Sequence, residues 1–536
     1  MATNTNSSTK YADVISKSVL IQPGSPAVYQ LTPKKENIGS LTRMTLGEKD
    51  PNKINKTILL VGETGTGKST LINALVNYAM GVEWEDDVWF KIVEEERSHS
   101  GTQTSDVIVY PIFGFEDKTL PYSLTIIDTP GYGSTAGIEH DVIISQRLLN
   151  LFRSEDGVHE INAVGLVMKE SENRLNDRLR YIFDSVISLF GKDMEKNIVA
   201  LITHSDGRTP KNALEALEAA KIKCARNEKN QPVHFLFNNC QDEDRTEDEE
   251  DLKHADKITT EGMSQLTKFL EKTAPQKLEK TVGVLEERIK LKTCIQNLQD
   301  RIEMIDLKQT EIQQTQGALK KHEEEMKKNE KFTIEVDEVY KDKEPIDGGM
   351  WLLVFYEAAT CCTVCEENCH YPGCTMAWYP EHCEVMRSGR CTSCTGKCPA
   401  SDHVKEKWKY VNKTRKAQKT LEDVKEKYET KAGSEGKLNL LETLKTDMAE
   451  LQKKKDQLLE ESFQHVVKLE QITLNVNSVS IYDHLDFLIE KMKEKGDTEK
   501  EKKLEEMKCR MDEDEGIQAA LRYGFSKLTA AGKAKK

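Results

Sequence analysis

Residues 56–75 read KTILLVGETGTGKSTLINAL, and this stretch decides the fold of the 536-residue chain. An apolar run at 58–61 comes before a glycine-rich turn, and an amphipathic run begins at Leu71. A strand, a glycine loop and a helix in this order form the context in which the pattern G-x-x-x-x-G-K-[ST] binds phosphate. The glycines let successive backbone amides turn towards a diphosphate, and the helix directs its positive dipole end at the same anion. The sequence therefore predicts an α/β P-loop fold with a mostly parallel sheet.

Two side chains of this loop have specific roles in such a site. Lys68 should reach the β- and γ-phosphates, and Ser69 should place its hydroxyl on Mg²⁺. A glycine turn in an ordinary sheet is the alternative, and the Lys-Ser pair and both flanking runs argue against it. We therefore predict that a nucleoside triphosphate binds to Gly62, Glu63, Thr64, Gly65, Thr66, Gly67, Lys68, Ser69 and Thr70.

A second motif predicts a switch that senses the γ-phosphate. The sequence DTPG, from Asp128 to Gly131, closes an apolar strand at 122–127. An Asp at such a strand end can hold a magnesium water, and the amide of Gly131 can contact the γ-phosphate. Loss of the γ-phosphate on hydrolysis would then change the conformation of the DTPG loop.

Two further strand ends predict the base. The segment THSD at 203–206 follows the apolar run 197–202, and two asparagines follow the run 233–237. The carboxylate of Asp206 can accept hydrogen bonds from a guanine ring N–H and from its exocyclic amine, and adenine lacks both donors. Asp206 alone could be a surface-turn residue, but its order with the other motifs favours GTP and GDP over ATP. The residues expected on the base side are Thr203, His204, Asp206, Asn238 and Asn239.

Taken in order, the motifs resemble one branch of the P-loop GTPases. The P-loop, DTPGYG at 128–133, THSD at 203–206 and FNN at 237–239 resemble the motifs of septins and of immunity-associated (GIMAP-type) GTPases in the translation-factor-related class. The resemblance covers about 56–270. It is closer still to a group that joins such a G domain to coiled coils and a Cys/His module. The resemblance to septins and immunity-associated GTPases implies that the G domains pair, so that a residue of a second chain can assist hydrolysis.

The resemblance also implies which threonine completes the Mg²⁺ shell beside Ser69 and Asp128. In SGTQTS at 100–105, Thr104 fits the septin-like pattern best and Thr102 is the runner-up. Thr104 is then also the in-chain candidate for holding the attacking water. Two positions depart from the pattern. His204 stands where N/T-K-x-D has a lysine, and Tyr132 stands where Ras-like enzymes place a water-orienting glutamine.

A Cys/His-rich segment supplies the second strong pattern. Two C-x2-C-x3-C halves begin at Cys362 and Cys391, and each has a histidine within five residues of its last cysteine. Such spacing is typical of structural zinc sites, which leave no open water position. Disulfides are the alternative for the cluster and free thiols for single cysteines, and the absence of a leader argues against disulfides. We predict about two Zn²⁺ ions, which need eight ligands. The ten candidates are Cys362, Cys365, Cys369, His370, Cys374, Cys383, Cys391, Cys394, Cys398 and His403.

Apolar heptads lie on both sides of this segment and predict coiled coils. The two arms form either an antiparallel hairpin with the Cys/His module near its tip, or a pairing with another molecule. The first seam consists of Leu291, Leu298, Ile305, Ile312 and Leu319, with Ile295 and Ile302 between them. The second consists of Leu441, Leu444, Met448, Leu451 and Leu458.

The expected domains are an N-terminal arm at 1–54, a G domain at 55–272, a coiled coil at 276–330, a zinc module at 332–403, a helical coiled coil at 404–510 and a tail at 511–536. A strand at 332–336 is expected to open the zinc module. The insertion at 81–90, with Trp84 and Trp89, is either a partner surface or a segment pinned to the G domain. The acidic loop at 241–251 is expected to be solvated rather than to bind a basic partner.

Composition limits the partners and the location. The net charge of −14 argues against nucleic acid, whose binding needs a basic face. Charged residues at 31% and hydrophobic residues at 37% suggest extended helical parts. Residues 1–10 lack the apolar core of a secretory leader, and no run of about 18 apolar residues could span a bilayer. We expect a cytoplasmic protein that pairs with itself and with an unknown protein, and peripheral membrane contact is left open.

Three classes of function are compatible with these motifs. The first is a slow GTPase that acts as an assembly or signalling switch through G-domain dimerisation and coiled coils. The second is a ubiquitin-ligase-like protein whose zinc module binds a conjugating enzyme, although the repeated short spacers differ from cross-braced RING spacing. The third is a scaffold whose nucleotide is not hydrolysed. GTP turnover separates the first class from the third, and a ubiquitin discharge assay tests the second.

Overall fold

The computed structural model describes residues 10–38, 41–94, 107–116, 118–130, 138–172, 177–246, 248–328, 333–346, 350–351, 355–356, 358–371, 374, 379–420, 422–423, 440–474, 479–513 and 518. The chain groups into two compact units. The first comprises Met1–Leu285, Gln471–Val479 and Cys509–Lys536, and the second comprises Glu286–Glu470 and Ser480–Lys508. None of the described helices is long and apolar enough to cross a membrane.

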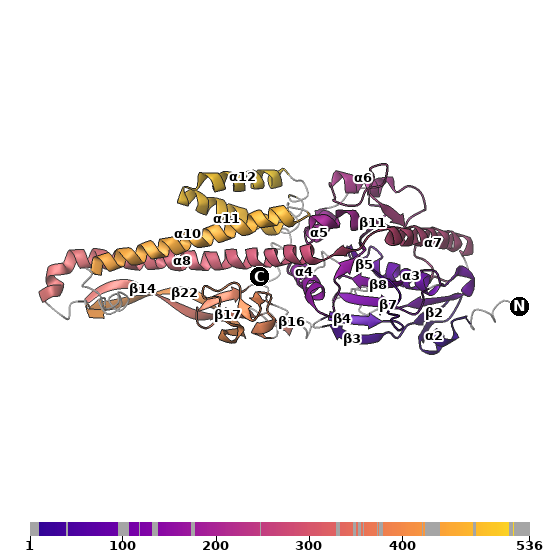
Figure 1. Ribbon diagram of the computed structural model, residues 1–536, viewed down its shortest axis with the longest axis horizontal. Coiled ribbons are helices and arrows are strands. Elements are labelled where there is room, and N and C mark those ends of the chain that lie inside the picture. Colours follow the sequence, from indigo (N-terminus) through magenta and orange to yellow (C-terminus); the bar gives the residue numbers. More distant parts are fainter. Residues whose placement is uncertain are drawn as a thin grey trace. The chain divides into compact units, whose positions relative to one another are not determined.

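An eight-stranded, mostly parallel sheet forms the centre of the first unit (Figure 1). The pairs β7–β8 and β3–β4 are antiparallel, and the other pairs are parallel. The two strands β8 and β11 are buried at every residue, which explains their unbroken apolar sequence. In spatial order the strands are β12 (His234–Leu236), β11 (Ile198–Thr203), β10 (Ala163–Lys169), β5 (Asn55–Gly62), β8 (Ser123–Asp128), β7 (Ile108–Ile112), β4 (Leu41–Thr45) and β3 (Lys34–Ile38).

A helix follows each of the parallel strands β5, β8, β10, β11 and β12 in the chain, and α4, α5 and α6 form the long crossovers that parallel strands need. These helices are α3 (Lys68–Met80), α4 (Ile138–Arg153), α5 (Asp177–Ile187), α6 (Lys211–Ala219) and α7 (Glu249–Lys272). A two-stranded ribbon of β9 (Glu160–Ile161) and β13 (Gln276–Lys277) adds to this unit. The predicted α/β P-loop fold is confirmed.

The carboxyl ends of four strands meet at one edge of this sheet. In the pairing of β5 with β8, Leu60 lies opposite Asp128, and in the pairing of β10 with β11, Lys169 lies opposite Thr203. Ligands of open α/β sheets bind outside the carboxyl ends of the strands. The glycine loop after β5, the DTPG segment after β8 and the THSD segment at the end of β11 therefore all begin at the same edge.

The N-terminal segment, expected as an arm at 1–54, contributes four strands to the sheets of this unit. Strand β4 pairs with β7, and β3 extends the sheet by one more strand. A second sheet joins β1 (Val19–Gln22), β2 (Ala27–Gln30) and β6 (Val88–Lys91), preceded by α2 (Ala12–Ser16). Val28, Leu41 and Met44 are buried in the core. These strands are short and carry both charges, so the alternation of apolar and polar residues that would predict a strand is weak in this part of the sequence.

The insertion at 81–90 is held by the domain. Trp89 is buried in β6, and the guanidinium of Arg245 lies 3.7 Å from the centre of the Trp84 ring. Arg245 also donates a hydrogen bond of 2.6 Å to the carbonyl of Trp84. Lys91 forms an ion pair of 2.8 Å with Asp242. These contacts favour pinning over a partner surface, and they show that part of the acidic loop serves the domain itself.

Two long antiparallel helices organise the second unit (Figure 1). They are α8 (Glu279–Lys328) and α10 (Leu440–Ile472). His465 Nδ1 lies 3.0 Å from Glu287 Oε2, and Lys455 Nζ lies 3.4 Å from Asp306 Oδ1, so residue numbers rise along α8 where they fall along α10. Helices α11 (Val479–Lys495) and α12 (Thr498–Asp512) follow, and Lys500 of α12 pairs with Glu460 of α10 at 2.6 Å.

The heptad seam of α8 is buried, whereas the seam of α10 has a shifted register. In α10 the buried apolar residues are Leu459, Phe463, Val466 and Leu469, so the seam passes through Leu459 rather than the predicted Leu458. Their spacing of three and four residues places them on one helix face. The side chains of Leu319, Leu441 and Leu444 lie outside the described residues. The α8 seam, at most 5% exposed, consists of Leu291, Ile295, Leu298, Ile302, Ile305 and Ile312.

A long β-hairpin frames the Cys/His module. Strands β14 (Thr333–Pro345) and β22 (Trp408–Thr420) pair antiparallel, from Thr333 opposite Thr420 to Pro345 opposite Trp408. The hairpin contacts α8, because the Gln314 side chain both donates to Asp337 Oδ2 and accepts from the Asp337 N–H, each at 2.9 Å. The strand predicted to open the module is present. The module extends to Thr420, whereas a helical segment was expected from 404.

Short strands carry the cysteines inside this hairpin. The three-stranded sheet has β17 (Ala359–Cys362) between β18 (Glu367–His370) and β21 (His403–Glu406). Strands β19 (Met386–Arg387) and β20 (Arg390–Cys391) form a small hairpin, and β15 (Met350–Trp351) pairs with β16 (Phe355–Tyr356).

Candidate functional site

The glycine loop connects the end of β5 to the first residue of α3. Gly67, the residue before the helix, has φ of 86°, which is the left-handed conformation that favours glycine. At Gly62 a Cβ atom would lie 2.5 Å from the carbonyl oxygen of Val167, so no larger residue fits there. The backbone thus adopts a tight loop at the amino end of a 13-residue helix. This is the geometry in which helix N–H groups point at an anion.

Lys68 lies under the loop. Its ammonium donates hydrogen bonds to the carbonyls of Gly62 at 2.9 Å and Glu63 at 3.1 Å, and the residue is 7% exposed. Burial lowers the pKa of Lys68 to about 8, although the carboxylates of Asp128 and Glu63 act in the opposite direction. The lysine is therefore fixed next to the loop in a setting where an anionic ligand would stabilise its charge.

The DTPG segment begins inside the protein. Asp128 is fully buried at the end of β8, and the hydroxyl of Thr129 donates to the Leu60 carbonyl at 2.8 Å. Burial, with Asp128 nearby, raises the pKa of Tyr110, so this phenol stays neutral. The structure thus places Asp128 beside the strand that leads into the glycine loop. Gly131 and Tyr132 lie outside the described residues, as do Thr102 and Thr104.

A hydrogen bond joins the THSD segment to the glycine loop. Thr203 is 2% exposed, and its hydroxyl lies 2.7 Å from the carbonyl of Thr66 and 3.2 Å from that of Met168. His204 has φ of 54°, and a Cβ placed on Gly67 would lie 3.7 Å from its Cε1, so the imidazole is next to the loop. Burial, with Lys169 as a second cause, lowers the pKa of His204 and favours the neutral ring. A neutral imidazole can lie against a base as the missing lysine would.

Asp206 is held in a turn at the edge of the site. Its N–H donates to Glu170 Oε2 at 2.8 Å, and its own carboxylate accepts from the Arg208 N–H at 2.8 Å. The Asp206 side chain is 60% exposed, and its second oxygen lies 3.8 Å from Arg208 Nε. The carboxylate can therefore accept hydrogen bonds from an incoming base.

The two asparagines after β12 lie close to the THSD segment at the end of β11. The Ser205 N–H donates to the Phe237 carbonyl at 3.0 Å, which joins the end of β11 to the residue before Asn238. The Thr259 hydroxyl, on α7, accepts from the Asn238 N–H at 3.0 Å and lies 3.3 Å from Asn239 Oδ1. Ser205 and Thr259 hold these segments together through hydrogen bonds. The sequence analysis did not identify them, because no sequence motif marks a single serine or a single threonine within a helix.

In the second unit, all ten predicted Cys/His candidates gather in groups that could hold metal ions. Within each group, the candidate ligand atoms all lie within 4.8 Å of one another. Three groups are present where two sites were predicted, and the third includes a glutamate that the sequence did not indicate. The first group is Cys362, Cys365, Cys394 and Cys398, the second is Cys369, Cys391, Cys394 and His403, and the third is His370, Cys374, Cys383 and Glu384.

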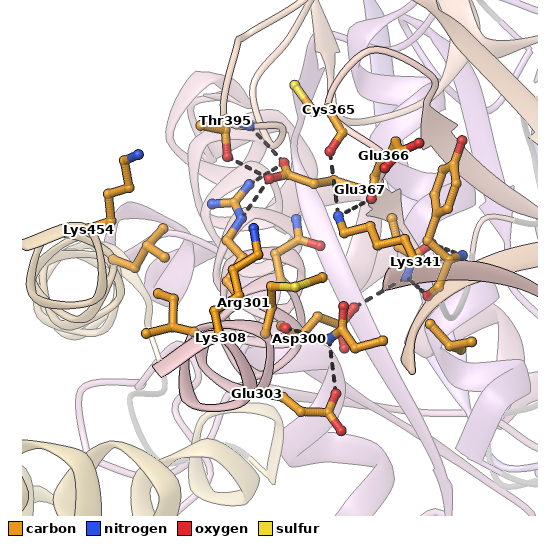
Figure 2. Close-up of a pocket in the computed structure, with 18 of the residues that line it drawn as sticks. Asp300, Arg301, Glu303, Lys308, Lys341, Cys365, Glu366, Glu367, Thr395 and Lys454 are labelled. Carbon is orange, nitrogen blue, oxygen red and sulfur yellow. Dashed lines mark hydrogen bonds and ion pairs between the residues drawn. The ribbon is translucent and has the colours of Figure 1, made fainter. Parts of the chain in front are cut away.

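A network of charged residues ties the cysteine-bearing turns to α8 (Figure 2). Glu367 accepts from Arg301 of α8 at 2.5 Å and from the hydroxyl and N–H of Thr395 at 2.6 and 2.8 Å. These residues line a cavity of about 1000 Å³ together with Lys341, whose ammonium donates to the backbone carbonyl of Glu366. Both acidic and basic groups line this cavity, so it shows no single charge that would select a ligand.

The family model described as Septin matches residues 52–147 of this chain. The matched segment carries the glycine loop and the DTPG motif, so this part of the chain is similar to septins. Septin-4 of Rattus norvegicus is 28% identical over 220 residues, which are 39% of this chain and 43% of the relative. Septin-1 of Drosophila melanogaster is 25% identical over 181 residues, which are 31% of this chain and 44% of the relative. The chain thus spans less than half the length of these septins.

Solved structures of Toc33 from Arabidopsis thaliana are also similar. Toc33 in complex with Mg²⁺ and GMPPNP is 15% identical with a TM-score of 0.28, over 42% of this chain and 88% of that chain. Toc33 with GDP and Mg²⁺ is 15% identical with a TM-score of 0.29, over 41% and 86%. A structure of atToc33 and psToc159, 16% identical with a TM-score of 0.25 over 39% and 84%, is described as showing that dimerization is important for the GTPase activity of those proteins.

Proposed function

We propose that this chain is a guanine-nucleotide-binding protein that hydrolyses GTP slowly and acts as an assembly or signalling switch. The observation that carries the proposal is the 2.7 Å hydrogen bond from Thr203 Oγ1 to the Thr66 carbonyl. It joins the base-side segment directly to the phosphate-side loop. A nucleoside triphosphate has a base at one end and phosphates at the other, so a single ligand can contact both segments.

Each described residue then has a role. Lys68 and the N–H groups of the glycine loop bind the phosphates, and Asp206 selects guanine by accepting from its ring N–H and exocyclic amine. Ser69 and Asp128 would hold Mg²⁺, whose positive charge would offset that of the phosphates. Their donor chemistry fits this ion, since hydroxyl and carboxylate oxygens are the ligands that Mg²⁺ prefers. Thr104, as the switch threonine and water-holding residue, and Gly131, as the γ-phosphate contact, are part of the same proposal.

Hydrolysis by a single chain is proposed to be slow. Tyr132 occupies the place of the water-orienting glutamine, and a phenol cannot both donate to and accept from the water as an amide does. An unassisted Ras-like switch works at about 10⁻⁴–10⁻² s⁻¹, and we expect this range. Pairing of two G domains, implied by the septin resemblance, would let a residue of the second chain supply the missing group.

The test is a comparison of GTP and ATP binding by the full chain, followed by single-turnover GTP hydrolysis over a dilution series. We expect GTP to bind more tightly than ATP and the rate per chain to rise with protein concentration. Thr104→Ala should suppress hydrolysis at every concentration. Equal affinity for ATP would refute the guanine assignment, and a fast rate independent of dilution would refute assistance by a second chain. Binding without any turnover would leave the scaffold function in its place.

For the second unit we propose a structural role, in which zinc holds the Cys/His module while the helices relay the state of the G domain to a protein partner. The described cysteines are free thiols, which suits a reducing compartment such as the cytoplasm. A ubiquitin discharge assay with the full chain separates this role from ligase activity. Discharge that requires Cys365 and Cys394 would favour the ligase.

A further inference from the structure

Cys394 stands between two groups of metal ligands. It is fully buried, and it is the residue that the first group and the second group share. A structural zinc ion takes four ligands, and each of these two groups reaches four only when Cys394 is counted in it. A thiolate sulfur has more than one lone pair and can bind two ions at once. The shared position is therefore that of a bridging ligand.

The sulfur spacing fits single ions held in tetrahedral sites. A Zn–S bond of about 2.3 Å places two ligand sulfurs about 3.8 Å apart around a tetrahedral ion. Cys365 Sγ and Cys398 Sγ of the first group lie 3.6 Å apart, as do Cys374 Sγ and Cys383 Sγ of the third group. A [4Fe–4S] cluster would hold its cysteine sulfurs farther apart, because each cysteine binds a different iron. Disulfide bonding is also excluded for these pairs by distance, since a bonded pair lies at about 2.05 Å.

Both cysteine halves fold into the same turn, which presents backbone N–H groups to sulfur. The Cys365 N–H points at Cys362 Sγ and the Cys394 N–H at Cys391 Sγ, each at 3.3 Å. Gly396 brings a third N–H within 3.3 Å of Cys365 Sγ, and a Cβ on Gly396 would lie only 2.9 Å from Cys398 Sγ. Glycine is therefore required where the backbone passes the sulfurs of the first group.

The imidazole of His403 is oriented as a ligand of the second group. Its Nδ1 lies 2.9 Å from the Pro399 carbonyl, so Nδ1 carries the proton and donates it. The lone pair is then on Nε2, which is buried and has no hydrogen-bond partner. A backbone carbonyl that fixes the tautomer in this way is the usual support of a metal-bound histidine.

Glu384 completes the third group. Its side chain is 2% exposed, and one carboxylate oxygen lies 3.1 Å from His370 Nδ1 and 3.7 Å from Cys383 Sγ. The other oxygen, Oε1, is buried without a hydrogen-bond partner. A buried carboxylate beside two cysteine sulfurs is unfavourable unless a cation neutralises it. A metal ion bound by His370, Cys374, Cys383 and Glu384 would satisfy this requirement.

The apolar core around these groups is small. The buried cluster around these groups consists of seven cysteines with Val385 and Met386, and Cys365 and Ala400 pack against it. So small an apolar core cannot stabilise a fold by itself, whereas metal binding by preformed ligands contributes directly to folding.

We propose that the module binds three zinc ions: a pair bridged by the Cys394 thiolate and a separate ion that has Glu384 as a ligand. Each cysteine binds as a thiolate, and its proton passes to solvent. This inference rests on the structural role proposed above for zinc and adds the number of ions, the bridge and the carboxylate ligand.

The first test is the metal content of the purified full chain, measured by mass spectrometry of the elements. We expect about three Zn²⁺ per chain in the wild type. Cys365→Ser should lose one ion, whereas Cys394→Ser should lose two, because its thiolate serves both sites. Glu384→Gln, which keeps the shape and removes the charge, should lose only the separate ion, and Gly396→Ala should weaken the first group with every ligand intact.

Cys361→Ser is the matched control. Cys361 is fully buried in the same segment, but its sulfur lies 3.5 Å from Asn368 Oδ1 and belongs to none of the three groups. The zinc content of the Cys361→Ser variant should equal that of the wild type. Circular dichroism of each variant shows whether the helices of the chain remain folded.

The second test needs no variant and therefore does not depend on mutant folding. In protein expressed with Co²⁺ in place of zinc, two ions that share a thiolate couple antiferromagnetically, and their paramagnetic resonance signal falls, while the separate ion keeps its signal. Two ions without coupling, or equal losses in Cys365→Ser and Cys394→Ser, would overturn the bridge. A full zinc content in Glu384→Gln would overturn the carboxylate ligand. A folded chain without zinc would instead overturn the structural role of zinc itself.

Discussion

Thr203→Val tests whether the hydrogen bond between the base-side segment and the glycine loop positions the nucleotide site. Valine has nearly the same shape as threonine and suits a strand, so the change removes the hydroxyl and little else. A hydroxyl donates one proton, and the shorter contact, 2.7 Å to the Thr66 carbonyl, takes it. One net hydrogen bond is worth about 0.5–1.5 kcal/mol. If the bond orders the loop for nucleotide, affinity for GTP should fall about two- to tenfold.

The assay is a titration of the full chain with a fluorescent GTP analogue in the presence of Mg²⁺, together with denaturant unfolding. Thr267→Val is the control, because Thr267 is also buried and donates to a carbonyl, that of Met263 at 2.8 Å, but within α7. It should leave GTP affinity unchanged. Wild-type affinity in Thr203→Val, or an equal loss in Thr267→Val, would refute the reasoning.

Three further changes test other residues. Lys68→Ala should abolish Mg²⁺-dependent GTP binding while the helices stay folded, as calorimetry and circular dichroism would show; normal affinity would mean that the loop binds another anion. Asp206→Asn should weaken GTP more than xanthosine triphosphate, whose ring presents an acceptor there, and competition binding measures this ratio. Burial raises the pKa of Glu287, but hydrogen bonds from His465, Lys290 and Lys468 outweigh it and hold that pKa well below the ordinary 4.5. Glu287→Gln should therefore destabilise the chain by about 1.5–3 kcal/mol at pH 7, and the difference should shrink as pH falls below about 4.5; a difference independent of pH in urea unfolding would contradict this.

The sequence was informative wherever the residues of a functional feature follow one another along the chain. The run 56–75 carries a strand, the loop and a helix without interruption, and each later motif directly follows an apolar strand. The carboxyl ends of parallel strands lie at one edge of a sheet. Because each motif directly follows a strand, the sequence predicted that the motifs lie close together at that edge. The α8 seam was equally readable, since a period of seven residues places Leu291, Leu298 and Ile305 on one face.

The sequence was less informative where a feature depends on distant partners. Strands β3 and β4 are short and mixed in charge, and only pairing with β7 makes them part of the sheet. The buried seam of α10 passes through Leu459, Phe463 and Val466, which the weaker apolar pattern before them did not indicate. The two tryptophans of the insertion gave no indication of Arg245, which lies about 160 residues away and holds Trp84 in place.

By itself, the sequence determined the phosphate loop, the strand ends that face it and the set of ten cysteine and histidine candidate ligands, because each is a local pattern of residue types. Only the tertiary structure decided how those candidate ligands are divided into groups. The two halves interlock so that Cys394 is shared and Glu384 joins a third group, and neither fact follows from spacing. Spacing along a chain fixes which ligands can meet in one turn, whereas the pairing of β17 with β18 and β21 fixes which turns meet each other.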